Sequence, residues 1–317
     1  MTKVNLIYKK LPDCYQSKEF GGIKIKAFKN DDESLHNGPL GQLYGARFES
    51  VEQMLKETNG QPRYSNQFWT WGRNPCPEAY GLGYFFQSWL LPRLGPGKTF
   101  AQIRIDPTWA ARYLRQLGFT GKVMGIDVRQ NVLDWAVKTH PAENTDYYRI
   151  ESWQNGWPSL KFDVAMTAGL AQNLSCVKEL SVFLGRVKRR MQPEGYYLFY
   201  AKILPAGGVG ELIEKFKREG KEVEVVQATD ELATVLVPDK RLADIIPRLT
   251  WDEFDELPPH LQKGMRVMTF YNGLTLEECV SDVFDIGEIL TPSGRETASL
   301  QLASGSLWPY MALGAVA

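Results

Sequence analysis

The feature that most constrains the fold is a regular alternation of strand-like and helix-like segments through the middle of the chain. Short apolar runs typical of buried strands alternate with segments whose apolar residues recur every three to four positions. Strands joined by crossover helices form a parallel sheet with helices on both faces. The sequence therefore predicts an α/β fold, with strands at residues 99–105, 122–127, 147–151, 162–167, 196–201, 222–227 and 233–238.

The segments between the strands set the expected order of the sheet. The last two predicted strands are joined by a turn too short for a crossover, so they must run antiparallel. We expect a seven-stranded sheet whose last strand is antiparallel, with Pro238 ending the core. Helices are predicted over residues 108–117, 129–139, 177–191 and 210–219.

On this pattern the chain divides into three parts. Residues 1–96 are predicted to form an N-terminal extension, 97–238 the sheet-containing core, and 239–317 a C-terminal appendage packed on that core. Within the appendage, residues 266–271 have the pattern of a strand. The apolar tail, residues 307–317, is too short to cross a membrane and is expected to dock on the protein's own surface.

Composition and charge exclude several classes of partner. The 317 residues include 37 Lys plus Arg and 37 Asp plus Glu, so no global field attracts the chain to nucleic acid or to an acidic membrane. No segment approaches the roughly 20 apolar residues of a membrane span. Neither partner is therefore expected, and the oligomeric state is left open.

Cysteine and histidine usage predicts neither a metal site nor a disulfide framework. The chain has four cysteines and three histidines, all widely spaced, whereas metal and disulfide motifs show close pairs. We expect four separate thiols in a reducing compartment. Because the N-terminus lacks the apolar run of a signal peptide, the expected location is the cytoplasm.

Three local strings carry a resemblance to a known family. They are residues 90–136, LLPRLGPGKTFAQIRIDPTWAARYLRQLGFTGKVMGIDVRQNVLDWA; residues 162–169, FDVAMTAG; and residues 182–201, VFLGRVKRRMQPEGYYLFYA. In order and spacing they resemble the first two, the fourth and the fifth strands of class I S-adenosylmethionine-dependent methyltransferases. The resemblance implies a Rossmann-like seven-stranded sheet, S-adenosylmethionine as cofactor and a small-molecule substrate.

The chain departs from this family at the cofactor-binding loop. The family's first strand ends in an acidic residue followed by Gly-x-Gly-x-Gly, whose glycines let the backbone approach the cofactor. In this chain the acid is replaced by Gln102, and the three glycines by Arg104, Asp106 and Thr108. Arg104 would place a long side chain where the cofactor needs space, so the loop is expected to be altered.

Other positions of the implied site are retained at the strand ends. The resemblance gives Asp127 the role of binding the ribose hydroxyls, although a solvated strand-end Asp is the alternative. Glu151, Ser152 and Trp153 follow the third strand, where the family contacts adenine. Trp153 is suited either to stacking on a base or to core packing. Thr167 ends the fourth strand, on the rim where open sheets bind ligands.

Aromatic residues are concentrated just before the first strand of the core. Rings with a polar group suit a pocket that holds a cation or a flat ring, and we expect this segment to close the pocket over Asp127 and contact the substrate. The alternative is that these rings pack in the core. The candidates are Tyr64, Trp69, Trp71, Tyr80 and Tyr84.

Three functions fit these observations. The first is a small-molecule methyltransferase, or related transferase, that uses S-adenosylmethionine through an altered loop. The second is an enzyme of the same fold that has lost the cofactor, and the third is a non-catalytic binding or scaffold protein. The loop substitutions favour the last two, whereas Asp127 and the aromatic segment favour the first two. The sequence does not identify a catalytic residue or an acceptor.

Overall fold

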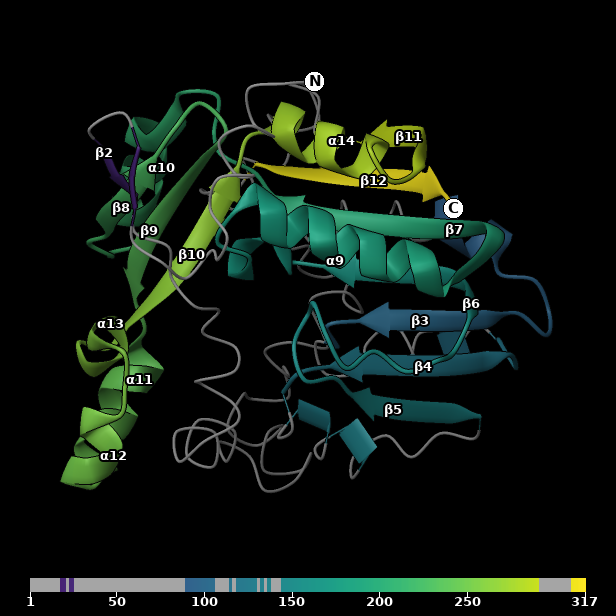
Figure 1. Cartoon of the computed structure of the whole chain (residues 1–317), viewed down its shortest axis with the longest axis horizontal. Coiled ribbons are helices and arrows are strands. Elements are labelled where there is room, and N and C mark those ends of the chain that lie inside the picture. The colour runs from purple at the N-terminus through teal and green to yellow at the C-terminus, as the bar shows by residue number, and fades with distance from the viewer. Residues whose placement is uncertain are drawn as a thin grey trace.

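The computed structural model describes most of the chain from residue 89 onward (Figure 1). The five aromatic candidates between residues 64 and 84 lie outside the described residues, as do Asp106 and Thr108. Of the predicted helices 108–117 and 129–139, only a few helical residues are described. The described ranges are 18–20, 23–25, 89–105, 114–115, 118–129, 132–133, 136–137, 144–290 and 309–317.

A seven-stranded sheet forms the centre of the fold, as predicted. Its order is β11-β12-β7-β6-β3-β4-β5. Strands β3 to β7 run parallel to one another, whereas β12 pairs antiparallel with both β7 and the edge strand β11. The Rossmann-like α/β class is confirmed. The strands are β3 (Thr99–Ile103), β4 (Lys122–Asp127), β5 (Thr145–Arg149), β6 (Phe162–Ala168), β7 (Met191–Lys202), β11 (Asp285–Leu290) and β12 (Tyr310–Val316).

The prediction of which strands complete this sheet is wrong. The segments expected to do so form β8 (Glu224–Ala228) and β9 (Leu232–Pro238), which pair antiparallel as the short turn requires. They join β10 (Met265–Tyr271) in a separate three-stranded sheet. The large sheet therefore continues beyond Pro238. The turn length fixes the direction of a hairpin, but it does not determine which sheet receives it.

The C-terminal tail is an interior strand and does not dock on the surface as expected. Strand β12 lies between β7 and β11, in register from Tyr310 opposite Lys202 to Val316 opposite Tyr196. Leu313 and its neighbours Ala312 and Ala315 are buried. A strand covered on both faces is apolar at successive positions, which explains the composition of the tail.

Each face of the large sheet is covered. Helices α9 (Val177–Arg190) and α14 (Gly273–Ser281) pack in the larger core cluster on one face, and Figure 1 shows α9 crossing that face. Trp89 and Leu90 belong to the cluster on the other face, just before the 3-10 turn η2 (Leu91–Arg93). Burial on both sides accounts for the almost unbroken apolar runs of the central strands.

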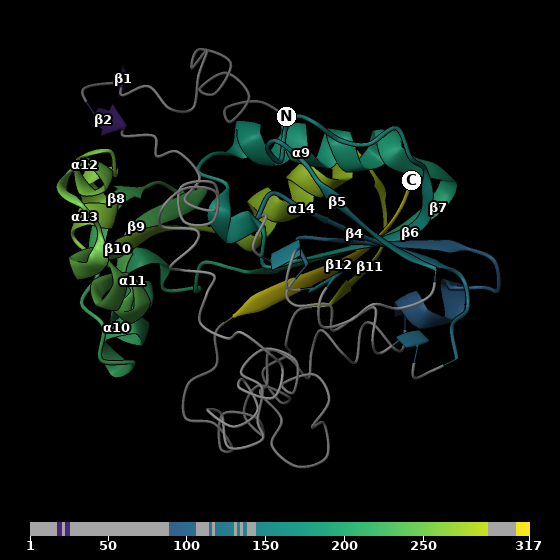
Figure 2. The same ribbon diagram turned by 90° about the horizontal axis from the view of Figure 1, so that it is seen from below.

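The small sheet lies beyond the carboxyl ends of the parallel strands (Figures 1 and 2). Figure 2 shows it grouped with most of the remaining helices. An isolated bridge between Ile203 and Tyr271 connects the two sheets. The other elements are α10 (Gly208–Arg218), α11 (Lys240–Ile245), α12 (Trp251–Asp255), α13 (Pro259–Gln262), η3 (Ala171–Asn173), η4 (Ile246–Arg248), and an N-terminal pair, β1 (Lys18–Phe20) with β2 (Ile23–Ile25).

The cysteines differ from the expectation of four separate thiols. Cys176, which precedes α9, is disulfide-bonded. Cys279 on α14 is a free, buried thiol, and burial raises its pKa to about 12. The wide sequence spacing of the cysteines did not reveal this bond, because a disulfide depends on proximity in space.

The interior position of β12 predicts a difference between two residues that face each other across the β11–β12 pair. Leu313 is buried, whereas its partner Ile289 is partly exposed. We expect Leu313→Ala to lower the free energy of unfolding by about 2–5 kcal/mol, and the control Ile289→Ala by about 1 kcal/mol or less. Urea unfolding followed by circular dichroism measures both. Equal losses would contradict an interior β12.

Candidate functional site

The candidate site lies where β3, β4 and β6 end on the same side of the large sheet. Ligands of open α/β sheets bind beyond the carboxyl ends of the strands. At this edge β3 is followed by Arg104 and Ile105, β4 ends at Asp127, and Thr167 is near the end of β6. The sequence-derived candidates Gln102, Arg104, Asp127 and Thr167 are thus brought to neighbouring strands.

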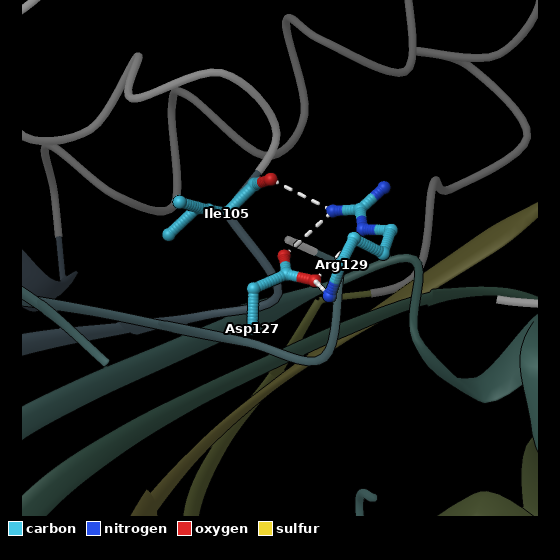
Figure 3. Close-up of polar contacts among 3 residues, drawn as sticks. All are labelled: Ile105, Asp127 and Arg129. Carbon is cyan, nitrogen blue, oxygen red and sulfur yellow. Dashed lines mark hydrogen bonds and ion pairs between the residues drawn. The ribbon is translucent and has the colours of Figure 1, made fainter. Parts of the chain in front are cut away.

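Asp127 is engaged by an arginine two residues further along the chain. The Nε and the backbone N–H of Arg129 donate to Asp127 Oδ1 at 2.8 and 2.9 Å. Arg129 Nη2 donates to Asp127 Oδ2 at 2.7 Å and to the Ile105 carbonyl at 2.7 Å (Figure 3). The result is a bidentate, charge-assisted pair that joins the end of β4 to the segment after β3.

This pair is closed off from solvent. Asp127 is 0% exposed and Arg129 is 5% exposed. A ribose diol could reach the carboxylate only by displacing the guanidinium, which would separate a buried ion pair at high cost. Both sequence-based interpretations of Asp127, as a ribose ligand and as a solvated strand end, differ from this arrangement. Arg129 was not among the site residues predicted from the sequence. The signal that could have identified it is an arginine two positions after an aspartate at a strand end.

Arg104, which the resemblance puts at the first glycine position of the family's loop, has a glycine-like backbone. Its φ is +60°, in the left-handed region that costs a non-glycine residue about 1–2 kcal/mol. Its backbone N–H donates to the Ile126 carbonyl at 2.8 Å. Its side chain reaches Gly169, at the end of β6, where a Cβ would lie 3.4 Å from Arg104 Nη1. The guanidinium therefore lies across the strand ends.

Gln102 and Thr167 face the protein interior. Gln102 is buried, and within the described part of the chain its Oε1 has no hydrogen-bond partner. Thr167 Oγ1 accepts a hydrogen bond from the Tyr197 hydroxyl at 2.9 Å, and burial raises the pKa of Tyr197 above its usual range. Thr167 thus contributes to a buried polar contact beneath the rim.

The segment after β5 has mainly structural contacts. Ser152 Oγ accepts from the backbone N–H groups of Gln154 and Asn155 at 3.3 and 3.0 Å, forming a turn. Trp153 is 1% exposed and meets Phe183 of α9 edge to face, with ring centroids 6.2 Å apart. Trp153 therefore packs in the core, the alternative considered for it. Glu151 is exposed at the surface.

Among the residues that the structure describes, no group of three or more His, Cys, Asp or Glu side chains is placed to hold a metal ion. None of the helices in that part of the chain combines the length and the apolar character needed to cross a membrane.

Comparison with known proteins gives similarity of structure and not of sequence. No family model matches the chain, and no curated protein matches it. Among solved structures, the PH0226 protein from Pyrococcus horikoshii OT3 is 12% identical, covers 82% of this chain and 98% of its own, and has a TM-score of 0.51. An S-adenosylmethionine-dependent methyltransferase from Mesorhizobium loti is 15% identical, covers 75% and 98%, and has a TM-score of 0.47.

At these identities the similarity concerns the fold. Five parallel strands followed by an antiparallel pair are the arrangement expected from the family resemblance, and the observed sheet has it. The chain therefore has the Rossmann-like fold of class I methyltransferases. What it binds depends on the site itself.

The buried pair predicts strong coupling between Asp127 and Arg129. Removing one partner leaves the other as an uncompensated buried charge. Asp127→Ala and Arg129→Ala should therefore each lower the free energy of unfolding by about 3–5 kcal/mol. The double variant should lose much less than the sum. Chemical unfolding of all four proteins in a double-mutant cycle measures this coupling.

The exposed pair between Lys217 and Glu214 on α10 is the matched control, and its cycle should show no comparable coupling. Additive losses at Asp127 and Arg129 would contradict the geometry of the site.

Proposed function

We propose that this chain is a methyltransferase-fold protein that has lost S-adenosylmethionine and acts by binding and not by methyl transfer. The observation that carries the proposal is the buried Asp127–Arg129 pair. Its guanidinium lies on the carboxylate that the resemblance gives to the cofactor ribose. The protein thus supplies its own partner for the group that would anchor the cofactor.

The residues present do not fit the cofactor in the family's manner. Gln102 replaces the acid at the end of the first strand, and Arg104 directs a long cationic side chain across the strand ends. The Arg104 side chain thus takes up space beside Gly169 at the strand ends, where the family's glycines let the backbone approach the cofactor. We therefore derive no methyl-transfer step for this chain.

A binding role is favoured over a different catalytic role by what the polar groups of the site do. A catalytic acid or base must be within hydrogen-bond reach of the proton that it transfers. Here Asp127 accepts three hydrogen bonds from Arg129, and Thr167 is engaged by Tyr197. These contacts hold strands together, which is the behaviour of a structural network.

A second candidate is a small-molecule transferase that uses S-adenosylmethionine through an altered loop. One observation favours it: Asp127 ends β4, in the position implied for the ribose ligand. In this case Arg129 would have to move away when the cofactor binds. Glu151 would then contact the cofactor, and Tyr64, Trp69, Trp71, Tyr80 and Tyr84 would remain the proposed substrate contacts. Small-molecule binding and a cytoplasmic location likewise remain predictions.

Cofactor binding separates the two candidates. We expect equilibrium dialysis of the full chain against radiolabelled S-adenosylmethionine to show no saturable uptake, because the buried pair blocks the ribose position. Calorimetry with S-adenosylhomocysteine should likewise show no binding heat. Dialysis is included because it detects binding that releases no heat.

Saturable binding of S-adenosylmethionine with a Kd below about 1 mM would contradict the proposal that the chain has lost the cofactor. That limit is the upper end of usual enzyme KM values. Asp127→Asn would then be compared with the wild-type chain. A tenfold or greater loss of affinity in that variant would establish the second candidate's use of Asp127.

A further inference from the structure

A cavity of about 680 Å³ lies at the junction between the two sheets. It opens to the surface and is lined by the loop after β7, the turn between β8 and β9, the start of α14, and β12. Ligand pockets for small molecules are typically about 300–1,000 Å³. None of its lining residues belongs to the Asp127 site, so the cavity is a separate feature of the fold.

The walls of the cavity are mainly apolar. Ile203 and Leu204 line it from the loop after β7, Met311 from β12, and Val209 from the first turn of α10. Leu274 lines it from α14 and is 72% exposed. A large apolar side chain left this open beside a cavity provides a contact surface for an apolar ligand.

The charged side chains that line the cavity are both acidic. Asp230 and Glu277 line it from opposite elements, the β8–β9 turn and α14, and no lysine, arginine or histidine is among the lining residues. Two carboxylates near low-dielectric walls create a negative potential, which attracts cations. An apolar wall with a negative rim matches a ligand that has a hydrocarbon body and one positive end.

The two elements that hold these carboxylates are tied together. Asn272 at the start of α14 accepts from the Thr275 N–H through Oδ1 at 2.6 Å and donates through Nδ2 to the Asp230 carbonyl. The Asn272 N–H donates in turn to the Glu231 carbonyl at 2.8 Å. The turn and the helix therefore keep a fixed separation, so the site is largely formed before a ligand arrives.

We propose that this cavity binds a small organic cation, an amine with an apolar body. The hydrocarbon part packs against Leu274 and Met311, and the ammonium group lies near Asp230 and Glu277. This gives the proposed binding function a ligand class. This inference rests on the proposed function in one respect, namely that the chain does not transfer a methyl group. It is otherwise independent, because no cavity residue contributes to the Asp127 site.

Three matched compounds test the charge preference on the full-length protein: 4-phenylbutylamine, 4-phenylbutan-1-ol and 4-phenylbutanoate. They share one apolar body and differ in the charge of the end group. Saturation-transfer NMR titrations should give millimolar Kd values for ligands of this size. The amine should bind about threefold to tenfold more tightly than the alcohol, and the carboxylate most weakly. Added salt should weaken the amine alone.

Variants locate the binding in the cavity. Ala228 and Ala206 line it from exposed positions, so Ala228→Phe or Ala206→Phe should fill it and weaken all bound compounds at least about tenfold. The control Ala243→Phe, at an exposed position on α11 outside the lining, should change nothing. Asp230→Asn with Glu277→Gln should reduce the affinity of the amine to that of the alcohol, which should itself be unaffected.

Several results would overturn the proposal: no binding of any compound at about 10 mM, an alcohol or carboxylate that binds as tightly as the amine, or two phenylalanine variants with unchanged affinity. These outcomes are independent of cofactor binding. If the chain binds S-adenosylmethionine but not the amine, both the loss of the cofactor and the amine site are refuted. If it binds neither compound, only the amine site is refuted.

Discussion

The carboxyl-end edge of the large sheet depends on one buried ion pair, in which Arg129 is held between the Asp127 carboxylate and the Ile105 carbonyl. A buried charge is tolerated only when a partner and hydrogen bonds compensate for its lost hydration. Here both come from neighbouring strand ends, so the pair fixes how the chain leaves β3 and β4. The same contacts lie at the carboxyl ends of the strands, the edge at which open α/β sheets bind ligands.

The remaining groups at this edge are consistent with a structural role. Arg104 keeps the left-handed backbone of a glycine while placing a guanidinium over Gly169. Thr167 is bonded to Tyr197 inside the core. Strained backbone is retained where surrounding contacts over-determine it, and here the Arg104 N–H is held by the Ile126 carbonyl. At this edge Asp127 and Thr167 are thus each hydrogen-bonded to a neighbouring side chain.

The small sheet supplies part of the wall of the cavity at the junction between the two sheets. Had β8 and β9 completed the large sheet, no wall would stand opposite the loop after β7. Because the tail supplies β12 instead, β8 to β10 form a separate sheet, and the cavity opens at the junction of the two sheets. The apolar lining and the two carboxylates at that junction come from segments far apart in the sequence, which only the arrangement of the two sheets brings together.

Local sequence patterns were sufficient to predict the parallel part of the sheet. Strand β4 has the predicted limits, Lys122–Asp127, because apolar runs and helical periodicity are local properties. The resemblance also predicts, from the sequence alone, that Gln102 stands at the acidic position of the family's loop and Arg104 at its first glycine position. Tertiary structure alone decided that the tail and not β9 completes the sheet, and that Arg129 seals Asp127. Strand pairing and side-chain direction depend on which surfaces become buried together, and no local pattern encodes that choice.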